Sequence, residues 1–211
     1  MQSKPRTPEE TYGPALRKAR SAFPMLLPRE AAVRAGISYQ RQDTGSSHFR
    51  VPFMNSCYRI SWPEGLVVQA EANELPDVAT QILLLHYLLT ADGTPVAGQW
   101  ISFRNLSGGL GYFAAFQGRA NLRLAQTFGH DQVGFEAAAK TLSGERLTFG
   151  DASFLFRVLP RVWIAVVLNL GDEEFSANAN VLFDAAASHY LPTEDLAVLG
   201  GILAGRLIRT S

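Results

Sequence analysis

The residues best suited to chemistry gather between Gly171 and Asp195, in the segment GDEEFSANANVLFDAAASHYLPTED. Asp184 ends a predicted buried strand, where an apolar environment raises the pKa of a carboxyl group and favours a general base. His189 lies shortly after it in the chain. We therefore predict Asp184 and His189 as a catalytic acid–base pair. The alternative is structural, with the Asp184 carboxylate accepting hydrogen bonds from backbone donors of the loop that follows.

The same segment offers ligands for a divalent cation, because carboxylate oxygens and one imidazole suit such ions. The predicted metal set comprises Asp172, Glu173, Asp184 and His189. Their spacing matches no established ligand signature. In the alternative interpretation, Asp172 and Glu173 belong to a solvated turn.

A second group of residues predicts a pocket for a ligand or cofactor. The glycine-rich stretch SGGLG precedes a predicted helix, and backbone N–H groups at a helix N-terminus bind anions. Nearby aromatic residues would form an apolar wall, arginines would clamp a carboxylate or phosphate, and a histidine in LLLHYLL would ligate a haem, corrin or metal. The predicted set is His86, Trp100, Arg104, Gly108, Gly109 and Arg119. The alternatives are a flexible connection, core aromatics and a satisfied core histidine, and the identity of the cofactor stays open.

Several classes of protein are excluded by what the sequence lacks. Cys57 is the single cysteine, which excludes an internal disulfide, a cysteine-rich zinc site and a self-contained iron–sulfur cluster. Neither a G-x-S-x-G elbow nor a P-loop is present. Serine hydrolase and P-loop chemistry are therefore disfavoured, and the lone cysteine indicates a reducing, cytoplasmic compartment.

The charge balance bears on partners. The 211 residues include 19 Lys plus Arg and 19 Asp plus Glu, so the formal net charge is zero. No long-range positive field is available to hold a polyanion, and we expect no nucleic-acid partner. The longest apolar run, Val162 to Leu168, is far shorter than the roughly 20 residues that cross a bilayer, so we expect no membrane span.

Periodicity predicts the elements that must position these residues. Apolar residues at helical spacing predict helices, and alternation or continuous apolar runs predict strands. The expected helices are 14–22, 28–35, 76–91, 112–126, 132–142 and 194–208. The expected strands fall within 37–70 and at 99–104, 153–158, 162–170 and 180–184.

This order of elements predicts an α+β fold, because strands come in runs instead of alternating singly with helices. We expect one domain over residues 9–211, with helices packed on a largely antiparallel sheet, and a disordered tail over residues 1–8. The run VWIAVVLNL should be a central strand. On the last helix, Ala197, Gly201 and Gly205 form a smooth side that would suit a homodimer.

Three stretches carry a resemblance to a known family. They are QILLLHYLLTADGTPVAGQWISFRNLSGG, the turn GDEEF, and VLFDAAASHYLPTEDLAVLGGILAGRL. With these, the chain closely resembles the bacterial and archaeal family catalogued as domain of unknown function 3786, over roughly Ala22 to Ile208. The resemblance implies anaerobic metabolism, and some similar proteins carry a four-cysteine iron–sulfur domain of the corrinoid iron–sulfur type. This chain lacks that module.

Three functional hypotheses follow. The favoured one is an accessory protein that binds a small molecule or a corrinoid- or haem-type cofactor, linked by the resemblance to corrinoid and iron–sulfur metabolism. The second is a metal-assisted or acid–base enzyme that uses the Asp184 and His189 region. The third is a homodimeric interaction protein.

Overall fold

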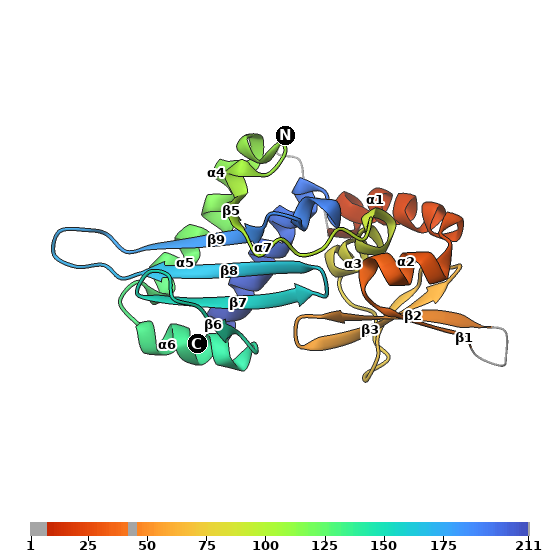
Figure 1. Cartoon of the computed structure of the whole chain (residues 1–211), viewed down its shortest axis with the longest axis horizontal. Helices are drawn as coiled ribbons and strands as arrows, with labels where there is room; N and C mark the ends of the chain where they lie inside the picture. Colours follow the sequence, from red (N-terminus) through yellow and green to blue (C-terminus); the bar gives the residue numbers. More distant parts are fainter. Residues whose placement is uncertain (1–7, 42–45, 211) are drawn as a thin grey trace, which may run out of the picture. The chain divides into compact units, whose positions relative to one another are not determined.

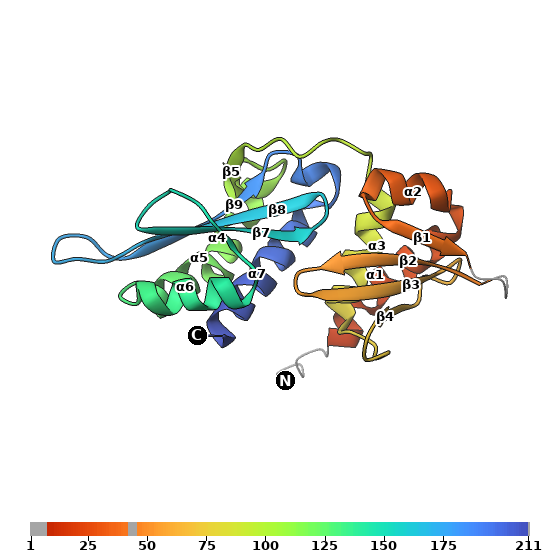
Figure 2. The same cartoon turned by 60° about the horizontal axis from the view of Figure 1, so that its bottom comes forward.

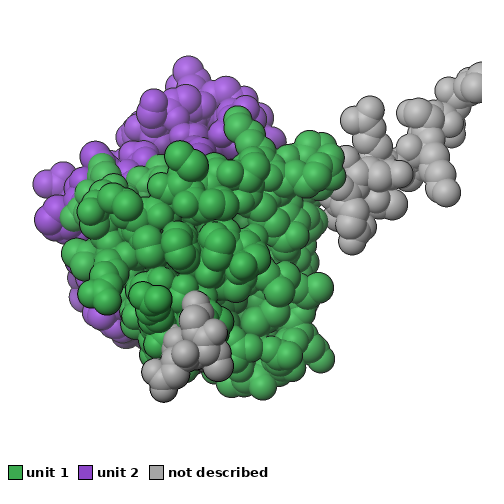
Figure 3. Space-filling model, turned by 90° about the vertical axis from the view of Figure 1, so that its right-hand side faces the viewer, with its two compact units in different colours: residues 1–93 green, residues 94–211 purple. Residues whose placement is uncertain are grey.

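The structure is a computed structural model that describes residues 8–41 and 46–210 of the 211-residue chain. The side chains of residues 8–10 are not among those described. The chain divides into two compact units, residues 1–93 and 94–211, which Figure 3 shows in different colours. Each unit has its own sheet and its own helices, and each is described in turn below.

Unit 1 is a four-stranded antiparallel sheet with strand order β1-β2-β3-β4 and three helices (Figure 1). Each strand pairs with the next strand along the chain, as expected for hairpins joined by short turns. The elements are α1 (Pro8–Ala22), η1 (Phe23–Met25), α2 (Pro28–Ala35), β1 (Ser38–Arg41), β2 (Ser47–Phe53), β3 (Ser56–Trp62), β4 (Val67–Gln69) and α3 (Val78–Thr90).

The core of unit 1 lies on one face of this sheet. Phe49, Val51 and Phe53 alternate with more exposed residues along β2, and they are fully buried. Phe49 packs edge-on against Phe23, with the ring centroids 5.8 Å apart. The Tyr87 hydroxyl donates to the Ala35 carbonyl at 2.6 Å, which fixes α3 to α2. The opposite face of the sheet therefore stays open to solvent.

Unit 2 is a five-stranded antiparallel sheet with strand order β5-β9-β8-β7-β6. Helices α5, α6 and α7 lie along one face of the sheet (Figure 2). The elements are β5 (Trp100–Ser102), η2 (Phe103–Asn105), α4 (Gly109–Arg119), α5 (Asn121–Phe128), α6 (Gln132–Thr141), β6 (Glu145–Arg146), β7 (Ala152–Leu159), β8 (Val162–Asn169), β9 (Asn178–Asp184), η3 (Ala187–His189) and α7 (Thr193–Arg209).

An aromatic cluster links the helices of unit 2 to the inner face of its sheet. The Phe103 and Phe116 rings stack with centroids 4.2 Å apart, and both lie about 6 Å from the ring of Phe183 on β9. Gly200 of α7 is part of the same packing, because a Cβ built there would lie 2.7 Å from the Phe116 ring. The absence of a side chain at Gly200 thus allows α7 to approach α4 closely.

The predicted fold class is confirmed: the chain is mixed α+β with antiparallel pairing throughout the described strands. The run VWIAVVLN is β8, the middle strand of its sheet, as expected. The strands form two sheets and not the one sheet that we expected. The predicted tail lies outside the described residues except for Pro8, where α1 begins, and the single domain over residues 9–211 stays a prediction.

Two helix boundaries differ from the expectation. α1 continues through Pro14, which is exposed, so that water can hydrate the carbonyl that the proline leaves without its helical donor. The predicted helix 112–126 is broken at Ala120 into α4 and α5. Of the helices in the described ranges, none is long and apolar enough to cross a membrane.

Candidate functional site

The structure gives Asp184 a structural environment. Its side chain is fully buried at the end of β9 and accepts three backbone hydrogen bonds. Oδ1 accepts from the N–H groups of Ala97 and Ala186, both at 2.9 Å, and Oδ2 accepts from Gly98 at 2.7 Å. The carboxylate thus satisfies donors of the segment before β5 and of the turn after β9. This is the alternative role that the sequence left open.

His189 lies near the other end of the same segment. Its Nδ1 is 3.2 Å from the hydroxyl of Thr94, and the neighbouring Tyr190 hydroxyl donates to the Thr94 carbonyl. Asp184 and His189 therefore both contact residues 94–98, the first segment of unit 2, through these hydrogen bonds. Their predicted role as a catalytic pair stays a prediction, and this geometry supports a structural one.

The predicted metal ligands are not brought together. Asp172 and Glu173 belong to the turn between β8 and β9, whereas Asp184 ends β9 at its other end. At about 3.3 Å per residue, the strand separates them by roughly 20 Å. The Asp172 carboxylate instead accepts from the N–H groups of Glu174 and Phe175, and these two bonds hold its pKa below the ordinary value. Within residues 8–41 and 46–210, no group of three or more metal-ligating side chains is found.

The predicted cofactor set is divided between the two units. His86 is half-buried on α3 of unit 1, and the other members belong to unit 2. Arg104 is exposed and lies over the Phe113 ring, 5.9 Å from its centroid, and Arg119 is exposed in the last turn of α4. The aromatic residues that we expected to wall a pocket include Phe103 and Phe116, which are core residues.

The two glycines of this set have a conformational role. Gly108 has φ of +73°, which other residues rarely adopt, and a Cβ at Gly109 would lie 2.0 Å from the carbonyl oxygen of Phe103. The tight start of α4 therefore requires both of them. Trp100 lines a hollow on the outer face of the sheet of unit 2.

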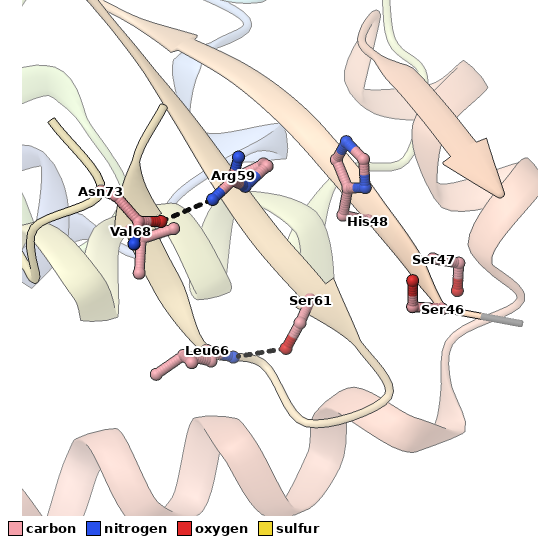
Figure 4. A pocket seen from close by; sticks show the side chains of 8 residues that line it. All are labelled: Ser46, Ser47, His48, Arg59, Ser61, Leu66, Val68 and Asn73. Atoms are coloured by element: carbon pink, nitrogen blue, oxygen red, sulfur yellow. Dashed lines mark hydrogen bonds between the residues drawn. The ribbon is translucent and has the colours of Figure 1, made fainter. Parts of the chain in front are cut away.

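A site that the sequence did not single out lies on the open face of the sheet of unit 1. It is a hollow of about 460 Å³, shown in Figure 4. It is lined by polar side chains with two aliphatic ones at one edge, namely Ser46, Ser47, His48, Arg59, Ser61, Leu66, Val68 and Asn73. We call it the basic hollow.

Strand register determines which side chains share this face. His48 pairs with Ser61, and two residues further along β2, Arg50 pairs with Arg59. Side chains on alternate residues of a strand point to the same face, so these four face outward, opposite to the buried Phe49 and Ile60. Arg59 in turn pairs with Val68 of β4, which brings an apolar side chain beside the guanidinium.

Arg50 and Arg59 lie directly opposite each other on adjacent strands. Like charges in this position repel and destabilise a sheet. Within the described parts of the chain, neither Arg50 nor Arg59 forms an ion pair with a carboxylate. On this face, Arg50 is exposed and Arg59 is half-buried.

The Arg59 guanidinium is held in a defined orientation. Its Nη2 donates to the Asn73 side-chain oxygen at 2.6 Å, and Asn73 lies in a tight turn after β4 with φ of +56° (Figure 4). Arg50 is less constrained and contacts the Cys57 sulfur at 3.7 Å. The Ser61 hydroxyl oxygen accepts from the Leu66 N–H at 3.2 Å at the floor of the hollow.

The electrostatics of the hollow affect His48. Partial burial lowers the pKa of its imidazole, and the positive charges of Arg59 and Arg50 lower that pKa further. His48 is therefore mainly neutral at pH 7, and an anion bound between it and the arginines would reverse the shift.

The comparisons with known proteins identify a family. A family model described as a domain of unknown function (DUF3786) matches residues 28–206, which run through both units. The chain therefore belongs to this family, as the resemblance indicated. Neither the curated proteins nor the solved structures provide a match.

Proposed function

We propose that this protein is an accessory protein that binds a small anionic molecule, one with a phosphate or carboxylate group, in the basic hollow. The observation that carries the proposal is the pair Arg50 and Arg59, opposite each other on adjacent strands and without a carboxylate partner in the described chain. Such an arrangement costs stability, and local departures from good design concentrate at functional sites.

The chemistry of the hollow supports this ligand class. Guanidinium groups bind phosphate and carboxylate oxygens through paired, charge-assisted hydrogen bonds. The Ser46 and His48 side chains line the hollow together with Arg59, whereas Arg50 lies opposite Arg59 on the neighbouring strand, and Ser46 and His48 can complete the shell around such an anion. Leu66 and Val68 provide an apolar edge, so the ligand would carry a small apolar portion beside its anionic group.

The connection to corrinoid and iron–sulfur metabolism remains part of the proposal. Corrinoids carry phosphate or carboxylate groups at their periphery, so the basic hollow suits one of their side chains and not the macrocycle itself. Cobalamin is therefore included among the probes, together with inorganic phosphate, sulfate and citrate.

The test is calorimetric titration of the full chain with each probe at low ionic strength. We expect Arg59→Gln to weaken binding by about tenfold or more, because a charge-assisted hydrogen bond contributes about 1.5–3 kcal/mol. Arg50→Gln should weaken binding in the same direction. The matched control is Arg123→Gln, which changes an exposed arginine of α5 in unit 2 and should leave the affinity unchanged.

Two outcomes would reject the proposal. One is that the wild-type chain binds none of the four probes at millimolar concentration. The other is that Arg59→Gln and Arg123→Gln reduce the affinity equally, because the effect would then come from overall charge and not from the hollow.

A further inference from the structure

The outer face of the sheet in unit 2 carries a second hollow, of about 470 Å³, lined by Trp100, Phe149, Val167, Asn180 and Leu182. These residues come from β5, β8 and β9 and from the loop before β7. No charged side chain lines the hollow. We call it the aromatic hollow.

Register shows that the aromatic hollow is formed on the side away from the helices. Leu182 and Asn180 alternate along β9 with Val181 and Phe183, which are buried on the inner face, where Phe183 packs against Phe103 and Phe116. Asn180 pairs with Val167 of β8, which brings the two side chains next to each other. The floor of the hollow is therefore apolar with one amide.

The first wall, Trp100, is anchored through Asp184. Trp100 pairs with Asp184 across the β5–β9 ladder, and the buried carboxylate binds the N–H groups of Ala97 and Gly98 just before β5. The Gln99 carbonyl accepts from the Ala185 N–H at 2.9 Å. These hydrogen bonds fix the backbone at the start of β5 and at the end of β9. The half-buried indole of Trp100 is therefore held at the edge of the hollow.

The second wall, Phe149, is anchored by a different set of contacts. Its N–H donates to the hydroxyl of Ser153, a fully buried residue, at 2.9 Å. The next residue, Gly150, has φ of +56°, and a Cβ there would lie 2.8 Å from the Leu168 carbonyl oxygen. The backbone of the loop before β7 therefore packs directly against the end of β8. Despite this fixed backbone, Phe149 is 45% exposed.

The single amide of the hollow keeps an acceptor for a ligand. Asn178 Oδ1 accepts from Asn169 Nδ2 at 2.9 Å and from Asn180 Nδ2 at 3.2 Å. Asn180 therefore uses one N–H of its NH₂ group within the protein, and its carbonyl oxygen accepts no hydrogen bond from the described residues. A ligand that donates an N–H or O–H can bind this oxygen.

We propose that the aromatic hollow is a binding site for an uncharged aromatic molecule that carries an N–H or O–H donor. Two ring walls and an aliphatic floor favour a flat apolar ring. The lack of charged lining residues disfavours an ionised ligand, because its desolvation would not be compensated. The site is separate in chemistry from the basic hollow and does not depend on the function proposed above.

The test uses the uncharged fluorescent probe N-phenyl-1-naphthylamine, which has fused aromatic rings and one N–H donor. We expect saturable binding of one probe per chain. Phe149→Ala should weaken it by about five- to tenfold, as expected for the loss of one aromatic contact. Asn180→Ala should weaken this probe but not naphthalene, which has no donor.

The matched control is Phe175→Ala, which removes another exposed phenylalanine, 69% exposed, from the turn between β8 and β9. This variant should bind the probe as the wild type does, and so should Arg59→Gln, in the basic hollow. Equal losses in Phe149→Ala and Phe175→Ala would overturn the proposal. So would a wild-type dimer that Phe149→Ala converts to a monomer, because a second copy would then cover the hollow.

Discussion

Replacing Asp184 by asparagine tests the structural role that its hydrogen bonds indicate. The carboxylate is fully buried and accepts three backbone N–H groups at 2.7–2.9 Å. In Asp184→Asn, the remaining oxygen can still accept from Ala97 and Ala186. The new NH₂ group then faces the Gly98 N–H, so two donors oppose each other and neither finds an acceptor.

The expected cost follows from these three bonds. Losing one charge-assisted hydrogen bond and leaving one buried donor unsatisfied should lower the free energy of unfolding by about 2–3 kcal/mol. Asp184→Ala removes every acceptor, so we expect a loss above about 4 kcal/mol, which is exceptional for a single substitution. An exposed catalytic carboxylate would behave in the opposite way, because its removal rarely destabilises a protein.

The assay is equilibrium unfolding in urea, followed by tryptophan fluorescence. The control is Asp131→Asn, which changes an exposed carboxylate that accepts from the Gly134 N–H at the start of α6. Asparagine caps helices about as well as aspartate, so this change should cost only a few tenths of a kcal/mol. A cost for Asp184→Asn within about 0.5 kcal/mol of the control would refute the reasoning.

Three further predictions follow from the structure. The pKa of His48 is lowered below 6.5 in the free protein, so sulfate should bind more tightly as the pH falls from 8 to 6. Binding should be accompanied by proton uptake, which calorimetry in two buffers detects and which His48→Gln should abolish. Gly200→Ala should lower the free energy of unfolding by about 1–3 kcal/mol, because the new Cβ would lie 2.7 Å from the Phe116 ring. Gly201→Ala should raise it by up to about 1 kcal/mol, because the nearest atom to its Cβ is 4.0 Å away. Unfolding of the two variants in urea compares these values. The Asp172 carboxyl should titrate below 3.8 by NMR, because two backbone N–H groups stabilise its charged form, and a value at or above 3.8 would contradict the turn geometry.

Local chemistry made the helices with clear boundaries predictable. The helix expected over 76–91 is α3 (Val78–Thr90), and Asp77 caps it by accepting a hydrogen bond from the Thr80 N–H. The break at Ala120 depends on a distant partner. The next residue, Asn121, is buried, and its side-chain oxygen accepts a hydrogen bond from the Val181 N–H on β9. Residues 182–184 of β9 pair with β5, and Val181 lies next to that paired segment. The two residues are 60 positions apart in the chain, so the helical periodicity of the sequence cannot predict this hydrogen bond.

The candidate sites show the same limit. The sequence indicates Asp184 as a candidate site residue, but its three hydrogen-bond donors come from turns whose approach to β9 no spacing rule predicts. In the sequence, Arg50 and Arg59 are recognisable only as polar residues that alternate with apolar ones. The register of the β2–β3 hairpin determines that the two lie opposite each other. A search for cationic residues on the polar side of each predicted hairpin would have found it.

The most direct test of anion binding maps the site at residue level. In a titration of the ¹⁵N-labelled full chain with sodium sulfate, at constant ionic strength set with sodium chloride, we predict saturable amide shifts concentrated on β2, β3 and the Asn73 turn. In Arg59→Gln these shifts should be lost. Linear shifts spread over both units, or saturable shifts centred outside the basic hollow, would contradict the proposed function.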